Sequence, residues 1–93
     1  MPNLILRRGA DVDIDPKSFT VTLRNESEID AQVRVTYTDN QTIAPIRTTV
    51  NVNILSFDSS VYSAPPGRLV DNVFMPEEQS DGTANPIGII VSF

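Results

Sequence analysis

The chain has 93 residues, of which 40% are hydrophobic and 20% charged, and its formal net charge is −5. A chain of this length builds one hydrophobic core, so residues 1–93 are expected to form a single domain. The acidic balance and the scattered basic residues argue against nucleic-acid binding, which needs a clustered positive surface.

Strand patterns dominate the first part of the chain. Residues 4–6 form a short apolar run, and in residues 11–15 aspartates alternate with Val12 and Ile14. Pro16 is expected to interrupt this second strand, because proline has no N–H to donate to a ladder. Residues 19–24 then alternate apolar and polar side chains, which is typical of a half-buried strand.

The middle of the chain holds the clearest strand pattern, residues 29–38, in which apolar and polar side chains alternate throughout. Residues 25–28 and 38–41 on either side of it are rich in turn-forming residues. The same alternation returns in residues 46–54. We therefore expect residues 19–24 and 29–38 to form a β-hairpin across the short acidic turn at residues 25–28, and residues 46–54 to form a further strand.

The last third is less regular. Residues 69–75 hold a short apolar pattern, and residues 76–86, with three acids between two prolines, predict a loop. Residues 87–93 place Ile87, Ile89, Val91 and Phe93 on one face and Ile90 on the other. Because both faces are apolar, this last strand is expected to be central or covered.

These patterns predict an all-β domain, a small antiparallel β-sandwich of about six to eight strands. An immunoglobulin-like arrangement is the best single expectation for this length and strand number, although the cysteine and tryptophan signature of antibody domains is absent. The expected core is Phe19, Val21, Leu23, Ile29, Ala31, Val33, Val35, Tyr37, Val50, Val52, Ile54, Ile89, Val91 and Phe93.

The residue inventory offers little for catalysis. The sequence has no histidine, cysteine or tryptophan, and Lys17 is its only lysine. The commonest acid–base group and the thiolate chemistry are therefore missing, and no nucleotide-binding or serine-hydrolase motif occurs. We expect a protein that is not an enzyme and that carries no cofactor.

The segment DVDIDP suggests calcium, because Asp11, Asp13 and Asp15 would share one face of a strand. It does not follow the EF-hand pattern, so a calcium site here would need further oxygen ligands, such as Asp81 or the pair Glu77 and Glu78. The alternative is a solvated strand edge, where repeated negative charge discourages pairing with another sheet.

Polar side chains on the outward parity of the strands form a candidate recognition surface for a sugar or a protein, or simply a hydrated sheet. The candidate binding residues on the strands are Thr20, Thr22, Gln32, Arg34, Thr36, Asn51 and Asn53. Those in the predicted loops 59–68 and 77–85 are Tyr62, Arg68, Glu77, Glu78 and Asp81. Two glycosylation sequons, at Asn25 and Asn40, fall in predicted turns and are interpreted as chance matches.

Three functions follow as hypotheses. The first is a structural or protein-interaction module that self-associates, such as a component of a viral or phage particle or of a surface assembly, joined through its apolar terminal strands. The second is a lectin-like module that binds carbohydrate or calcium, and the third is a small acidic inhibitor that docks on a larger protein. No signal peptide or transmembrane segment is predicted, so cytoplasmic synthesis or a particle-associated location is expected.

Overall fold

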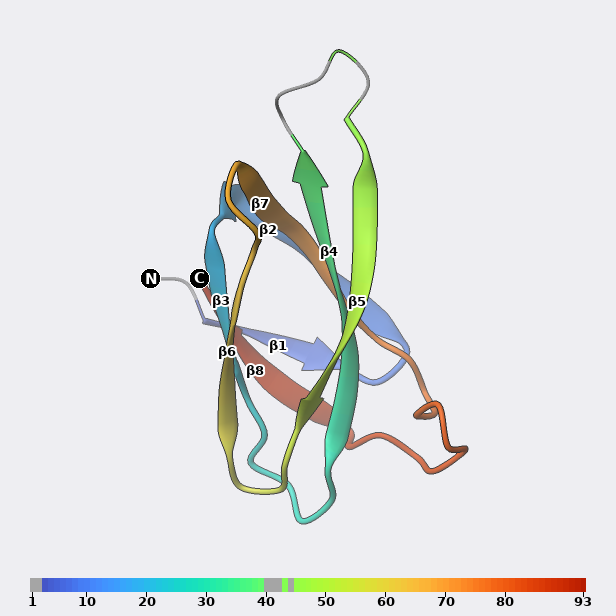
Figure 1. Ribbon diagram of the computed structural model, residues 1–93. Coiled ribbons are helices and arrows are strands. Elements are labelled where there is room, and N and C mark those ends of the chain that lie inside the picture. Colours follow the sequence, from blue (N-terminus) through green and yellow to red (C-terminus); the bar gives the residue numbers. More distant parts are fainter. Residues whose placement is uncertain (1–2, 40–42, 44) are drawn as a thin grey trace.

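The computed structural model describes residues 3–39, 43 and 45–93, and in them it contains eight antiparallel β-strands (Figure 1). The all-β prediction is thereby confirmed. The strands are β1 (Asn3–Arg7), β2 (Ala10–Ser18), β3 (Thr20–Arg24), β4 (Ala31–Asp39), β5 (Arg47–Ile54), β6 (Ser59–Ser63), β7 (Arg68–Met75) and β8 (Gly88–Ser92).

The strands form two four-stranded sheets that pack face to face. Sheet I has the order β1-β8-β3-β6 and sheet II the order β2-β7-β4-β5. The pairs β1–β8, β2–β7, β3–β6 and β4–β5 are those of one long ribbon folded back at the β4–β5 connection. Wrapping this ribbon adds the β3–β8 and β4–β7 pairs, and the result is the strand order of a jelly roll, an eight-stranded double sheet.

The immunoglobulin-like prediction is not confirmed. In an immunoglobulin domain the first two strands lie in the same sheet, whereas here β1 and β2 lie in different sheets. The physical reason is that alternation decides which side chains face the core, and this alternation is the same for every two-sheet sandwich. It does not decide which distant strands become neighbours.

The core lies between the two sheets and is built from the inward-facing side chains of both. Most of the predicted core is buried, but Phe19 and Ile29 are 49% and 47% exposed. Both precede the strand to which the sequence assigned them, because β3 begins at Thr20 and β4 at Ala31. The buried hydrophobic side chains are Leu6, Ile14, Val21, Leu23, Ala31, Val33, Val35, Ile54, Ala64, Val70, Val73, Met75, Ile89 and Val91.

Strand β2 continues through Pro16, so the predicted interruption at this residue is wrong. β2 is an edge strand, and an edge strand needs its N–H groups on one side only, which leaves room for a proline. The pairing of β2 with β7 nevertheless shifts register between Asp13 and Ser18. The disturbance is therefore confined to the ladder and does not end the strand.

The two terminal strands pair with each other. β8 lies between β1 and β3, which confirms that the last apolar segment is central, and β1 forms an edge of sheet I (Figure 1). Residues 76–86 form the predicted loop, with one isolated bridge between Glu78 and Ala84.

Candidate functional site

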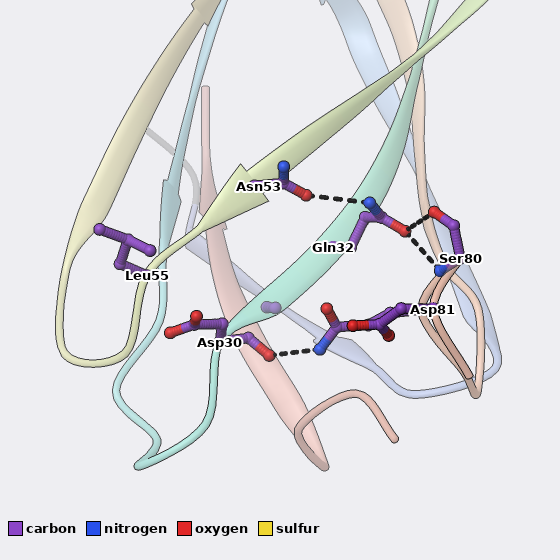
Figure 2. A pocket seen from close by; sticks show the side chains of 8 residues that line it. Asp30, Gln32, Asn53, Leu55, Ser80 and Asp81 are labelled. Atoms are coloured by element: carbon purple, nitrogen blue, oxygen red, sulfur yellow. Dashed lines mark hydrogen bonds between the residues drawn. The ribbon is translucent and has the colours of Figure 1, made fainter. Parts of the chain in front are cut away.

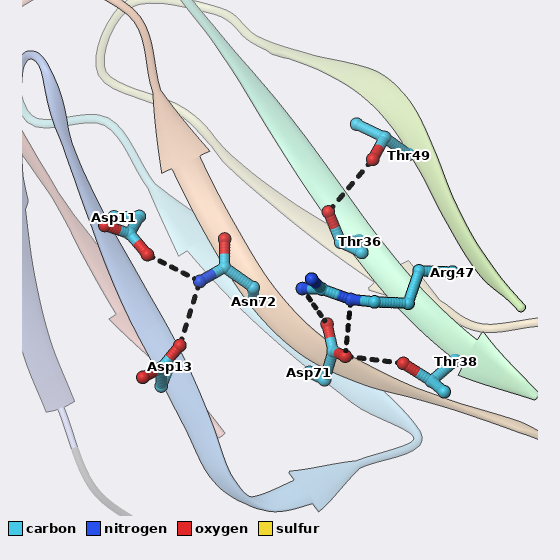
Figure 3. Close-up of polar contacts among 8 residues, drawn as sticks. All are labelled: Asp11, Asp13, Thr36, Thr38, Arg47, Thr49, Asp71 and Asn72. Carbon is cyan, nitrogen blue, oxygen red and sulfur yellow. Dashed lines mark hydrogen bonds and ion pairs between the residues drawn. The ribbon is translucent and has the colours of Figure 1, made fainter. Parts of the chain in front are cut away.

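The outer face of sheet II carries a β-bulge in β7. Val70 pairs with Tyr37 and Asn72 pairs with Thr36, so Asp71 is an extra residue in the ladder with β4. A bulge re-aims side chains, and here Asp71 and Asn72 both make contacts on the outer face (Figure 3). In β7 the buried Val70 is followed by the buried Val73, three residues later instead of two. This break in the alternation is the sequence signal that could have revealed the bulge.

Asn72 connects β7 to the aspartates of β2. Its side-chain amide nitrogen donates hydrogen bonds to Asp11, at 2.7 Å, and to Asp13, at 3.0 Å (Figure 3). Asp15 is exposed on the same strand. Within residues 3–39, 43 and 45–93, no three His, Cys, Asp or Glu side chains are gathered in a way that would hold a metal ion. A calcium site on Asp11, Asp13 and Asp15 stays a prediction.

Asp71 connects β7 to side chains of β4 and β5. Its carboxylate accepts hydrogen bonds from Nε and Nη2 of Arg47, at 3.2 and 3.3 Å, and from the hydroxyl of Thr38 (Figure 3). Thr38 is 3% exposed, whereas the Arg47 side chain is 60% exposed. The buried hydroxyl therefore depends on Asp71 more than the solvated guanidinium does.

The predicted binding residues of β4 and β5 are neighbours on this same face. The register places Gln32 opposite Asn53 and Arg34 opposite Asn51. The Gln32 amide donates a hydrogen bond of 3.0 Å to Asn53, and the Arg34 guanidinium lies 5.8 Å from the ring centre of Phe74. These side chains form a continuous polar surface whose groups already contact one another.

The predicted threonines divide between the two sheets. The hydroxyl of Thr36 lies 3.1 Å from that of Thr49, on the outer face of sheet II. Thr20 and Thr22 lie on β3, which belongs to sheet I. The structure therefore does not bring all the predicted binding residues of the strands onto one surface, because alternation gives parity within a strand and not the sheet to which the strand belongs.

A polar hollow lies where the 76–86 loop meets β4. The side-chain oxygen of Gln32 accepts hydrogen bonds from the backbone N–H of Ser80, at 2.8 Å, and from its hydroxyl, while Gln79 donates to the carbonyl of Asp30, at 2.7 Å (Figure 2). The volume of this hollow, called the loop hollow below, is about 310 Å³. Its lining is Asp30, Ala31, Gln32, Asn53, Leu55, Gln79, Ser80 and Asp81.

Asn85, which sequence reasoning missed, holds this loop in place. Its fully buried side-chain amide accepts a hydrogen bond from the N–H of Gln32, at 2.9 Å, and donates to the carbonyls of Gln32, at 3.1 Å, and Pro76, at 2.7 Å. The amide thus pairs with β4 as a strand residue would. Arg8 also donates to the Asn85 carbonyl. Asparagine in a loop is too common for its type alone to have indicated this role.

The prediction of a loop over residues 59–68 is wrong in part, because Ser59–Ser63 form β6, which pairs with β3, and Arg68 begins β7. Tyr62 packs against the core, where burial raises the pKa of its hydroxyl and the neighbouring Tyr37 raises it further. Arg68 lies at the start of β7, 3.9 Å from the carboxylate of Asp39, and it donates to the carbonyl of Pro66.

The acids of the 76–86 loop serve mainly its own geometry. Asp81 accepts hydrogen bonds from the N–H and hydroxyl of Thr83, and these bonds lower the pKa of its carboxyl group. The Glu77 side chain packs against Gly9, whose φ of 81° lies in the left-handed region that favours glycine. Glu78 forms the isolated bridge described above.

The sequon asparagine Asn25 is fully buried. Its amide donates to the carbonyls of Ile29, at 2.8 Å, and Ile54, at 3.1 Å, while its oxygen accepts from the N–H and hydroxyl of Ser27. A side chain bonded in this way is closed to glycosylation in the folded chain, in agreement with its interpretation as a chance match. The other sequon asparagine, Asn40, lies outside the described residues.

The outer face of sheet I carries an apolar hollow of about 260 Å³, called the isoleucine hollow below. Ile5 and Ile90 lie opposite each other in the β1–β8 ladder, and Ile5 and Ile87 are 65% and 73% exposed. Gly88, between them, contributes no side chain. The hollow is lined by Ile5, Arg7, Arg24, Glu26, Ile87, Gly88, Ile89 and Ile90. Ile5 and Ile90 have apolar outward parity in the sequence, whereas Ile87 was expected on the same face as the buried Ile89 and Val91. Ile87 is exposed because it precedes β8, which begins at Gly88.

No protein-family model, curated protein or solved structure gives a significant match to this chain. No helix in the described part of the chain is long and apolar enough to cross a membrane. What the protein does is therefore inferred from its surfaces.

Proposed function

We propose that the chain is a non-enzymatic structural or protein-interaction module that self-associates, such as a subunit of a viral or phage particle or of a surface assembly. Jelly rolls occur in capsid domains and in lectins, so the strand order agrees with this class, although a fold by itself assigns no function. The sequence has no histidine or cysteine, which leaves surface recognition as the simpler role.

The isoleucine hollow is the observation that carries this proposal. Single exposed apolar residues are normal on protein surfaces, whereas a cluster of them with a polar rim has the arrangement of an interaction site. Here Ile5 and Ile90 are adjacent, and Ile87 and Gly88 complete the same hollow. The arginines at its rim, Arg7 and Arg24, make a border of the kind that surrounds the apolar centre of many interfaces.

The edge strand β1 supports the same proposal. Its sequence NLILR has no proline and no charge before its last residue, whereas the edge strand β2 carries three aspartates, Pro16 and Lys17. Charges and proline are devices that keep sheet edges from pairing with other chains. The edge strand β1, beside the isoleucine hollow, therefore lacks the protection against pairing that the edge strand β2 has.

The test is absolute mass by light scattering over a dilution series. We expect an oligomer whose population falls on dilution below its dissociation constant. A monomer at every concentration would contradict the proposal.

A lectin-like role is the second candidate, and the loop hollow favours it. The amides of Gln32 and Asn53, the carboxylate of Asp30 and the hydroxyl of Ser80 line this hollow beside the exposed Leu55. Directed polar groups beside an apolar side chain suit the hydroxyls and the apolar face of a sugar ring. A glycan array, followed by titration calorimetry with the Gln32→Ala variant, tests this role. Binding that Gln32→Ala leaves unchanged would exclude the loop hollow as the sugar site.

A further inference from the structure

A second apolar feature lies at one end of the sandwich, where the 25–30 and 55–58 loops meet (Figure 1). Ile29, Leu55 and Phe57 are 47%, 59% and 70% exposed. The backbone N–H of Ser56 donates to the Asp30 carboxylate at 2.9 Å, so the two loops are held together. We call Ile29, Leu55 and Phe57 the apolar tip.

Phe57 is unfavourable for the isolated domain in two ways. Its φ of 56° is left-handed, a conformation that costs a bulky L-residue about 1–2 kcal/mol and that glycine adopts freely. Its ring is also the most exposed side chain of the tip. Residues held in such conformations gather at functional sites, where another interaction compensates for them. A turn optimised for stability alone would carry glycine at this position.

The charges around the tip restrict what could cover it. The 25–30 and 55–58 loops contain Glu26, Glu28, Asp30 and Asp58 and no basic residue. An apolar tip surrounded by carboxylates fits an apolar pocket with a basic rim, and it opposes an anionic lipid surface.

The isoleucine hollow of a second copy has these properties. It is apolar, and at its rim two arginines, Arg7 and Arg24, outnumber one carboxylate, that of Glu26. Arg24 forms a 3.3 Å ion pair with Glu26, but both side chains are about 60% exposed, so solvent keeps this pair weak and exchangeable. The volume of about 260 Å³ exceeds that of the roughly 150 Å³ cavities known to hold a benzene ring.

From these observations we propose that the apolar tip of one copy inserts into the isoleucine hollow of the next, with Phe57 as the inserted side chain. This inference rests on the proposed self-association and specifies its contact. Tip and hollow are different surfaces, so the contact is heterologous and can repeat from copy to copy, as assembly of a ring or filament requires.

The test uses two variants and one control. Phe57→Gly removes the inserted ring at a position where glycine suits the backbone, and Ile87→Glu places a carboxylate in the hollow at a 73% exposed residue. Ile46→Glu is the matched control, since Ile46 is 65% exposed and precedes β5 at the opposite end of the sandwich (Figure 1). Light scattering measures the mass of each protein and of an equimolar mixture of the first two variants.

Each variant alone should weaken association by at least about tenfold, as expected for a central interface residue. Their mixture should form a one-to-one complex, because one variant keeps an intact hollow and the other an intact tip. Ile46→Glu should associate like the unmodified chain.

Association of Phe57→Gly at unmodified strength would overturn the tip-into-hollow contact while leaving self-association intact. A mixture that stays monomeric when both variants do so alone would also overturn it, since that result indicates a symmetric contact. An unmodified chain that is monomeric throughout would contradict the proposed function itself.

Discussion

The two outer faces of the sandwich differ in whether their exposed side chains already have partners within the domain. On sheet II, Asn72 bonds to Asp11 and Asp13, and Asp71 bonds to Arg47 and Thr38 (Figure 3). On sheet I, the isoleucine hollow exposes apolar side chains that have no such partners within the domain. Burying an exposed apolar face on a partner is favourable, whereas polar groups that already bond to one another gain little from a new partner. The apolar face is therefore the stronger candidate interface.

The largest effect on stability is expected at Asn85, which fixes the loop beside the polar face. Asn85→Ala removes three hydrogen bonds of a fully buried amide and leaves the backbone of Gln32 without these partners. We expect the free energy of unfolding to fall by about 2–3 kcal/mol, since buried polar groups without partners cost about 1–3 kcal/mol each. Urea denaturation measures it.

Gln79→Ala is the control for this prediction. It removes one exposed hydrogen bond of the same loop and should cost less than about 0.5 kcal/mol. Equal losses in the two variants would show that Asn85 is not the anchor of the loop.

The direct test of the contrast between the faces compares Asp71→Ala with Ile87→Ser. Asp71→Ala should lower the free energy of unfolding by about 1–2 kcal/mol, because the buried Thr38 hydroxyl loses its acceptor. Ile87→Ser should change it by less than about 0.5 kcal/mol, since Ile87 is 73% exposed. Both changes in the free energy of unfolding are measured by thermal and urea unfolding, at protein concentrations too low for self-association.

Asp71→Asn, which keeps a hydrogen-bond acceptor for Thr38, should recover most of the loss. If Ile87→Ser proved as costly as Asp71→Ala, the isoleucine hollow would be part of the folded core and not a surface left for a partner.

The smallest effect concerns pH. The pKa of Tyr62 is raised by burial and by Tyr37, so above its usual value of 10.0 the unfolded chain loses this proton before the folded chain does. The Tyr62 contribution to stability is complete below that pH and is lost as the pH rises through the folded-state pKa. Titration of phenolate absorbance should show a late ionisation that is missing in Tyr62→Phe. A Tyr62 that ionises at its ordinary pH would contradict the expected loss of stability in this pH range.

Much of the fold could be predicted from alternation, because the order of apolar and polar residues within each strand indicates which of its side chains are buried. Residues 29–38 and 46–54 predicted the strands β4 and β5, and residues 87–93 a central last strand. The exceptions, Phe19, Ile29 and Ile87, lie just before β3, β4 and β8, where the alternation of the strand no longer decides which side chains are buried. The predicted hairpin of residues 19–24 and 29–38 is wrong, because β3 lies in sheet I and β4 in sheet II, and alternation does not specify which strands pair.

The candidate sites were less accessible to sequence reasoning. The outward polar residues of β4 and β5 were identified, but Thr20 and Thr22 proved to lie on the other sheet. The bulge at Asp71 and the buried amide of Asn85 depend on contacts with strands far along the chain. Such contacts leave almost no trace in local composition.

The sequence by itself determined an all-β domain, the faces of its main strands and the lack of histidine and cysteine chemistry, because each of these depends on side-chain type and local period. Only the tertiary structure decided the jelly-roll order, the joining of the first and last strands, and the hollow formed by Ile5, Ile87 and Ile90. The physical reason is that strand pairing is non-local: the same alternating strands fit several sandwiches, and the packing of the whole chain selects one of them.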